Sequence, residues 1–225
     1  MRGLRGNLGR IPQSQINLLL PGATSKHPDN PAHGHVVAFS RVPNLFDPPM
    51  KHFDFPRQFR AVYDKAVAFY AQGKRGAESF FTPDEIALLA ANGITPQHLY
   101  DYAEDHNGYD GEPGLENALG IELVRRDYFL NAQNGRASKA TLDSANLPAK
   151  ADAVRGIEWL PRLIPKARAK LHGELPPSLM YCCGGDRNFF EEHNILPHEF
   201  LSLVWRSENN DNAIVDWVAQ RSGAR

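Results

Sequence analysis

The stretch FTPDEIALLAANGITPQHLYDYAEDHNG, residues 81–108, contains two consecutive helix patterns. Each begins with a Thr-Pro pair, in which Thr82 or Thr95 is suited to the N-cap and the proline to the first helical position. Each ends in an Asn-Gly pair, at 92–93 and at 107–108, which is typical of a helix C-terminus. The stretch therefore predicts two helices joined by a tight turn, and this indicates an α-helical fold.

Helical periodicity continues on both sides of this stretch. Upstream, apolar residues recur at spacings of three and four and predict a helix that begins at Phe55 and stops at Gly73. Pro161 and Pro165 are expected in or near the first turn of a later helix, where a missing backbone N–H is tolerated. The downstream patterns predict helices over residues 115–135, 156–174, 187–206 with a break before Pro197, and 211–221.

These patterns divide the chain into four segments. Residues 1–55 are rich in proline and hold one strand-like run, HVVAFS (35–40), so we expect an extended or partly disordered arm. Residues 56–135 form a predicted N-terminal helical lobe, 136–152 a linker, and 153–225 a C-terminal helical lobe. The predicted fold class is therefore mainly α: a two-lobed helical domain with a Pro-rich, largely irregular N-terminal arm.

Composition argues against several classes of protein. The 225 residues include 25 Lys and Arg against 26 Asp and Glu, whereas nucleic acids and anionic membranes recruit a basic excess. The two cysteines are adjacent and cannot join distant segments, which favours a reducing compartment. The apolar run INLLLPGA (16–23) is too short to span a membrane. We expect a soluble cytoplasmic protein with no nucleic-acid or membrane partner, and its oligomeric state stays open.

Three runs in the C-terminal third carry a distinctive order of residues: WLPRLIPKARAKLHGEL (159–175), YCCGGDRNFFEEHNILPHEFLSLV (181–204) and DNAIVDWV (211–218). Over about residues 157–220 the chain resembles a bacterial domain-of-unknown-function family, number 5069. The matching positions are Leu160, Pro161, Arg162, Lys166, Ala167, Arg168, Tyr181, Cys183, Asp186, Phe189, Phe190, Trp217 and Val218. Cys182 departs from the family pattern. The resemblance implies a bacterial, mainly helical, soluble protein and no particular reaction.

Cys183 is the first candidate catalytic residue. The pair Gly184-Gly185 follows it, and Asp186 is suited to cap a helix that begins near Arg187. A cysteine just outside a helix N-terminus is favoured as a thiolate. The two glycines are candidate substrate-binding residues, because they let backbone N–H groups approach a ligand.

A base for this thiol is available in His193, which follows ten residues later. The alternative is structural: Cys182 and Cys183 fill space beneath a tight turn, since free cysteine is among the most buried residue types.

A second candidate site lies on the 95–107 helix. His98, Asp101, Tyr102 and Asp105 follow helical spacing and share one face. His98 and Asp101 are candidate acid–base residues, and together with Asp105 they are candidate ligands of a divalent metal. No strong metal-binding motif accompanies them, and a solvated polar helix face explains the same residues.

Basic residues provide a third candidate. Arg162, Lys166 and Lys170 recur at intervals of four, and the first two are candidate anchors for an anionic substrate, with Tyr181 as a further substrate-binding residue. Two alternatives are open: pairing with Asp186, or an exposed basic helix face.

No motif for a nucleotide cofactor or for an α/β-hydrolase nucleophile is present. The leading hypothesis is a small-molecule enzyme without an organic cofactor. It would act on an anionic substrate at a pocket between the helical lobes, through a helix-terminal cysteine or the His98/Asp101 face. The alternative is a non-catalytic helical module that binds a protein or ligand, using Ile214, Trp217 and Val218 if the final helix exposes them.

Overall fold

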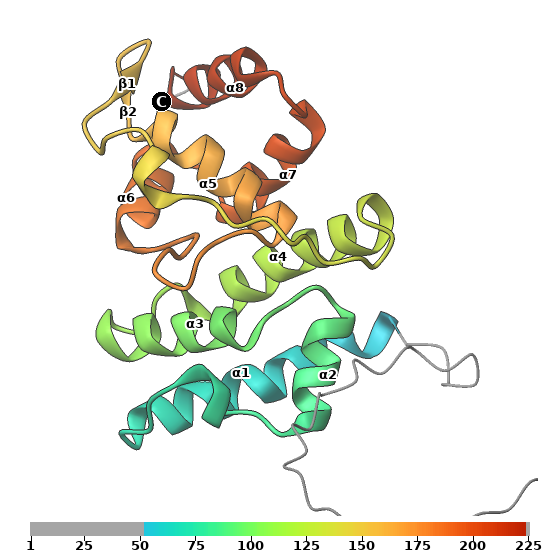
Figure 1. Ribbon diagram of the computed structural model, residues 1–225. Helices are drawn as coiled ribbons and strands as arrows, with labels where there is room; N and C mark the ends of the chain where they lie inside the picture. Colours follow the sequence, from blue (N-terminus) through green and yellow to red (C-terminus); the bar gives the residue numbers. More distant parts are fainter. Residues whose placement is uncertain (1–51, 224–225) are drawn as a thin grey trace, which may run out of the picture. The chain divides into compact units, whose positions relative to one another are not determined.

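The computed structural model describes residues 52–223, which fold mainly into α-helices (Figure 1). Residues 1–51 of the predicted arm, including its strand-like run at 35–40, lie outside the described residues. Eight α-helices make up this part of the chain: α1 (Phe55–Ala71), α2 (Pro83–Ala91), α3 (Pro96–Gly108), α4 (Gly114–Asp127), α5 (Leu160–His172), α6 (Gly184–Glu192), α7 (Pro197–Ser207) and α8 (Asp211–Gly223). The mainly α fold class is therefore confirmed.

Shorter elements connect these helices. They are three 3-10 turns (His52–Asp54, Ala77–Ser79 and Ser144–Asn146), a π-helical turn (Tyr128–Ala132) that continues α4, and the strands β1 (Ala153–Val154) and β2 (Ile157–Glu158). The strands pair antiparallel, with Ala153 opposite Glu158 and Val154 opposite Ile157. Apart from the 3-10 turn at 144–146, residues 136–152 carry no helix or strand.

Capping explains why α2 and α3 begin where the sequence predicts. The Thr82 hydroxyl accepts a hydrogen bond from the Glu85 backbone N–H, and the Glu85 carboxylate accepts one from the Thr82 N–H. This reciprocal pair is a capping box. Thr95 caps α3 through the backbone N–H of His98. Between them Gly93 has φ +71°, and a Cβ there would lie 2.5 Å from the Phe129 ring, so the turn requires glycine.

The predicted helix 156–174 begins later than expected. A hairpin occupies its first residues, because Arg155 (φ +51°) and Gly156 (φ +77°) adopt the left-handed backbone of a two-residue turn. Pro161 lies in the first turn of α5 as predicted, but Pro165 lies inside the helix. Its ring nitrogen carries no N–H, so α5 lacks one hydrogen bond at that point.

Two hydrophobic clusters form the core. One gathers side chains from α1, α2, α3 and the start of α4, among them Phe59, Leu99 and Ala118; the other gathers side chains from α4 through α8, among them Ile121 and Leu163. Helix α4 lies between the two groups of helices and contacts α1, α3, α5 and α7 (Figure 1). The predicted division into two lobes is not shown: all described residues belong to one compact unit.

Within residues 52–223, no helix combines the length and the apolar character that a bilayer crossing requires.

Candidate active site

The chain enters α6 through a strained turn. Cys182 has φ +72°, in the left-handed region, and Cys183 is extended and forms the N-cap. The helix begins at Gly184 rather than near Arg187, so the prediction that Asp186 is the N-cap is wrong. Asp186 lies in the first turn instead, and its carboxylate turns back to accept the backbone N–H of Cys182 at 2.8 Å. The N-terminal N–H groups of α6 therefore receive no side-chain cap.

The Asp186 carboxylate is buried and accepts two further hydrogen bonds. The Nζ of Lys166 lies 2.7 Å from Oδ2, and the Nε1 of Trp159 lies 3.0 Å from Oδ1. Lys166 is 1% exposed, so it does not belong to an exposed basic face. Of the alternatives for Lys166, pairing with Asp186 is the one found. The Asp186 carboxylate thus has three hydrogen-bond donors and one positive counter-charge, which offset the free-energy cost of burying a charged group.

The two cysteines occupy different environments. Cys182 is fully buried, and burial raises the pKa of its thiol. Cys183 is half-buried, and its Sγ lies 3.1 Å from the Nζ of Lys166. A nearby ammonium group and a helix N-terminus both stabilise negative charge on sulfur. The space-filling alternative therefore describes Cys182, whereas Cys183 is only half-buried.

Cys183 opens on a pocket of about 350 Å³. One wall is α3, which contributes three carboxylates, and the other is the segment that precedes α6. The lining residues are Asp101, Glu104, Asp105, Pro177, Ser178, Leu179, Met180 and Cys183. The pocket thus brings together the candidate thiol and two of the candidate residues on α3, which the sequence separates by about 80 positions.

Asp101 and Asp105 differ in what surrounds them. Burial raises the pKa of Asp101 to about 6, and the hydrogen bond from Gln97 at 2.6 Å opposes this only in part. Asp105 accepts a hydrogen bond from the guanidinium of Arg187 at 2.6 Å, and the same nitrogen also donates to the Cys182 carbonyl at 2.8 Å. Asp105 therefore orders the turn, while Asp101 is the carboxyl that titrates within the pocket near pH 6.

His98 and Tyr102 face a different group of residues. The Oε1 of Glu122 accepts hydrogen bonds from the Tyr102 hydroxyl (2.9 Å) and the Lys170 Nζ (2.6 Å). The Nδ1 of His98 lies 3.1 Å from the Lys170 Nζ. Burial acts to raise the pKa of Glu122, but Lys170 and His98 outweigh it and the net pKa is lowered. Lys170 is 3% exposed, so the alternative of an exposed basic helix face is wrong for Lys170 as it is for Lys166.

A metal site receives no support in residues 52–223. No group of three or more His, Cys, Asp or Glu residues there is arranged to hold a metal ion. The three candidate ligands are engaged with different protein groups: His98 with Lys170, Asp101 with Gln97, and Asp105 with Arg187.

Four other predicted site residues lie elsewhere or act structurally. His193 is at the far end of α6 and contacts Ser222 at 2.6 Å, so it is not brought to Cys183. Arg162 donates to the Pro148 carbonyl at 2.8 Å. The buried Tyr181 donates to the Pro197 carbonyl at 2.7 Å. A Cβ at Gly185 would lie 2.5 Å from the Trp159 ring, so this glycine makes room for an indole.

Three contributors to the site were not among the predicted site residues: Trp159, Glu104 and Arg187. Trp159 has φ +65°, which is rare for a bulky residue, and nothing local predicts that its indole reaches Asp186. Glu104 lies beside the face that His98 and Asp101 share and adds a carboxylate to it. Arg187 was expected only as the first residue of a helix, and nothing local predicts that its guanidinium reaches Asp105 on α3.

Comparison with known proteins adds one finding. Residues 146–225 match the profile of DUF5069, a domain of unknown function, so the C-terminal part of the chain carries this domain. The resemblance drawn from residues 157–220 is thereby confirmed. Three of the residues that carried it, Lys166, Cys183 and Asp186, meet in the site described above. Searches of curated proteins and of solved structures gave no match.

Proposed function

We propose that the protein is a small-molecule enzyme without an organic cofactor, in which Cys183 is the nucleophile. The observation that carries this proposal is the position of the Cys183 sulfur, which lies 3.1 Å from the Lys166 ammonium and lines an open pocket. Lys166 is itself fixed by Asp186 at 2.7 Å. A cation and a helix N-terminus beside a thiol are features that reactive cysteines share, and both support this role for Cys183.

The geometry favours transfer of an acyl group. The sulfur forms a bond to the acyl carbon, the bond to the leaving group breaks, and the Asp101 carboxyl gives its proton to that group. Water then attacks the thioester, Asp101 takes a proton from the water, and the thiolate leaves. Asp101 suits both steps because its pKa, raised to about 6, lies close to neutrality. The uncapped N–H groups at the start of α6 are placed to bind the oxyanion.

The charge of the pocket refines the expected substrate. Three carboxylates line the pocket beside Cys183. The two basic residues that were expected to hold an anionic substrate are engaged elsewhere: Arg162 contacts Pro148, and Lys166 contacts Asp186. A neutral or cationic group next to the reacting carbon therefore suits this end of the pocket better than an anionic one.

The test is residue-resolved alkylation of the native protein with iodoacetamide, read by peptide mass spectrometry. Cys183 should label in the folded state, and Cys182 only after denaturation, because Cys182 is fully buried. The variant Cys183→Ser, checked for folding by circular dichroism, should lose the release of p-nitrophenol from p-nitrophenyl acetate. Labelling of both cysteines only in denaturant, with equal ester cleavage by the variant, would show that the thiol is structural.

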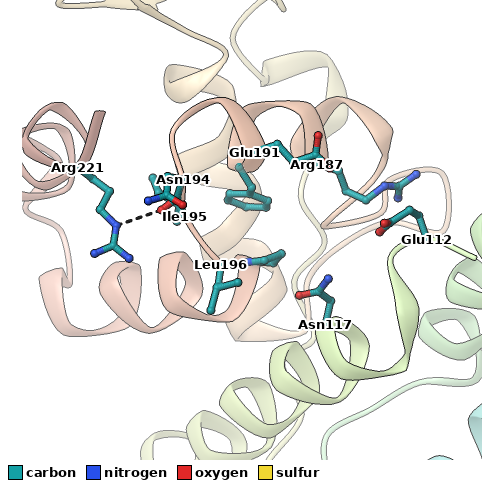
Figure 2. A pocket seen from close by; sticks show the side chains of 10 residues that line it. Glu112, Asn117, Arg187, Glu191, Asn194, Ile195, Leu196 and Arg221 are labelled. Carbon is teal, nitrogen blue, oxygen red and sulfur yellow. Dashed lines mark hydrogen bonds between the residues drawn. The ribbon is translucent and has the colours of Figure 1, made fainter. Parts of the chain in front are cut away.

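A second candidate function, a ligand-binding module, is favoured by a different cavity. This cavity measures about 580 Å³ and lies between α4, α6 and the turn into α7. Figure 2 shows Asn117, Glu112 and Arg187 on one side and Arg221, hydrogen-bonded to the Asn194 carbonyl at 3.1 Å, on the other. Exposed Leu196 adds an apolar surface between them.

The final helix does not expose the apolar residues that were expected to bind a partner of such a module. Ile214 and Val218 are 0% exposed and Trp217 packs against the core, so the final helix offers no apolar face built from them. A thermal-shift screen of small polar molecules separates the two functions. Hits that Asn117→Ala abolishes and Asp101→Asn leaves intact would assign binding to the cavity of Figure 2.

A further inference from the structure

The pocket beside Cys183 adjoins a second cavity of about 240 Å³. The two share four lining residues: Asp101 on α3, and Pro177, Leu179 and Met180 on the segment that precedes α6. The second cavity extends away from Cys183 along α3 toward His98 and Thr95, and toward Lys170 on α5. Because the same four residues line both spaces, the two cavities adjoin each other, and we refer to them together as the cleft.

The far part of the cleft is mainly apolar. Leu175, Pro176, Pro177, Leu179 and Met180 supply much of its lining. Its polar groups are largely engaged already. The Gln97 amide bonds to Asp101, the Tyr181 hydroxyl to the Pro197 carbonyl, and the Lys170 ammonium to Glu122. An occupant of this part therefore meets an apolar wall with few remaining polar groups.

The orientation of the His98 ring supplies one such group. Its Nδ1 lies 3.1 Å from the Lys170 Nζ and 3.3 Å from the Glu122 Oε1. We assign Nδ1 as the acceptor in the shorter of these contacts, because an ammonium can only donate. Burial lowers the pKa of His98, which favours the neutral ring, and in the tautomer assigned here the proton of that ring lies on Nε2. Nε2 is on the side of the ring away from Lys170, and the His98 side chain is 11% exposed where it lines the cleft. The far end of the cleft therefore presents an N–H donor.

We propose that the cleft takes an elongated, uncharged acyl compound, whose reacting carbon lies at Cys183, whose apolar chain lies along Leu179 and Met180, and whose terminal carbonyl accepts a hydrogen bond from His98 Nε2. This inference deepens the proposed function and rests on it. A neutral acceptor suits the far end better than a carboxylate, because Asp101 and Glu122 already balance the charge of Lys170 there.

The first experiment compares three chloroacetamides by their rates of Cys183 alkylation: the unsubstituted compound, an N-hexyl compound, and an N-hexyl compound that ends in a methyl ketone. In each reaction the sulfur–carbon bond forms as chloride leaves. The ketone probe should react roughly tenfold faster than the plain hexyl probe, the effect of one good hydrogen bond. His98→Phe should lower the rate of the ketone probe to that of the plain hexyl probe, so that the ratio of the two rates falls to about one. Equal rates for the two hexyl probes would overturn the inference while leaving the proposed function in place.

A second experiment needs no reactive thiol. In Cys183→Ser, the unreactive acetamide analogue of the ketone probe should shift the His98 ring resonances in a proton–nitrogen spectrum. Leu179→Trp, which fills the shared wall from a partly exposed position, should block the shift even if His98→Phe fails to fold. No shift at millimolar analogue would overturn the inference whatever the reactivity of Cys183.

Discussion

The Nζ atom of Lys166 lies 3.1 Å from the Sγ atom of Cys183, and this contact joins a buried ion pair to a half-exposed thiol. Lys166 also contacts Asp186 at 2.7 Å, so one ammonium both satisfies a buried carboxylate and lies against the sulfur. The stability of the fold and the reactivity proposed for Cys183 therefore involve the same residue, and substitutions that change one partner at a time separate the two.

Replacing Lys166 with methionine should destabilise the fold. The change leaves the Asp186 carboxylate buried without a counter-charge, which costs about 3–5 kcal/mol in comparable buried pairs. Urea unfolding followed by circular dichroism measures the loss. The double variant Lys166→Met/Asp186→Asn should recover part of it, because neither charge is then present. A single variant as stable as the natural chain would show that this pair does not hold the turn in place.

Gly185→Ala should destabilise the protein by about 1–3 kcal/mol, the usual range for overpacking. Its Cβ would lie 2.5 Å from the Trp159 ring, and the indole is held by its hydrogen bond to Asp186. The matched control is Gly184→Ala, whose Cβ meets only the Arg187 guanidinium at 3.7 Å. Thermal unfolding of both variants provides the comparison, and equal midpoints would contradict the packing role assigned to Gly185.

Asp101 should make stability fall as pH rises toward neutrality. Burial raises its pKa to about 6 in the folded protein, against about 3.9 in an unfolded chain. The folded state therefore binds more protons between these values. The contribution of Asp101 to stability is fully present below about pH 3.9 and is lost as pH passes through 6.

The measurement for Asp101 is the free energy of unfolding from pH 4 to 7. Asp101→Asn should gain stability relative to the natural chain across this range. Asp64→Asn, at an exposed position on α1, is the control and should run parallel to the natural chain. Parallel curves for Asp101→Asn as well would show that the carboxyl is not desolvated.

Glu122→Gln should be more harmful than Tyr102→Phe. The first change removes the counter-charge of the buried Lys170, at about 3–5 kcal/mol, and the second removes one hydrogen bond, at about 1 kcal/mol. Denaturant unfolding of the two variants gives the difference directly. Similar losses would mean that Lys170 finds another partner or loses its proton in the variant.

Helix positions could be predicted because their signals are local. The caps at Thr82 and Thr95 involve residues only three positions apart, and both were confirmed. The hairpin before α5 was missed because Arg155 adopts a left-handed backbone that its side chain does not favour. The segment boundaries at 136 and 152, and the reactivity of Cys183, stay predictions.

The candidate site could be predicted only in part, because its partners are distant in sequence. Cys183 and Asp101 were both singled out, and the structure places them in one pocket. The burial of Lys170 could not be predicted, since the i, i+4 spacing of basic residues is the same on a buried face as on a solvated one. Lys170 can be buried because it pairs with Glu122, which lies 48 residues away on α4. Trp159 and Asp186 likewise meet across 27 residues.

Helix α4 joins the two hydrophobic clusters of residues 52–223. It supplies Ala118 to one hydrophobic cluster and Ile121 to the other, so neither cluster is complete without it. The segment that matches DUF5069 begins at residue 146 and leaves α4 out. The domain recognised by sequence comparison is thus smaller than the compact unit to which α4 belongs. A fragment cut at residue 146 would expose the apolar surface of α5 and α7 that α4 covers.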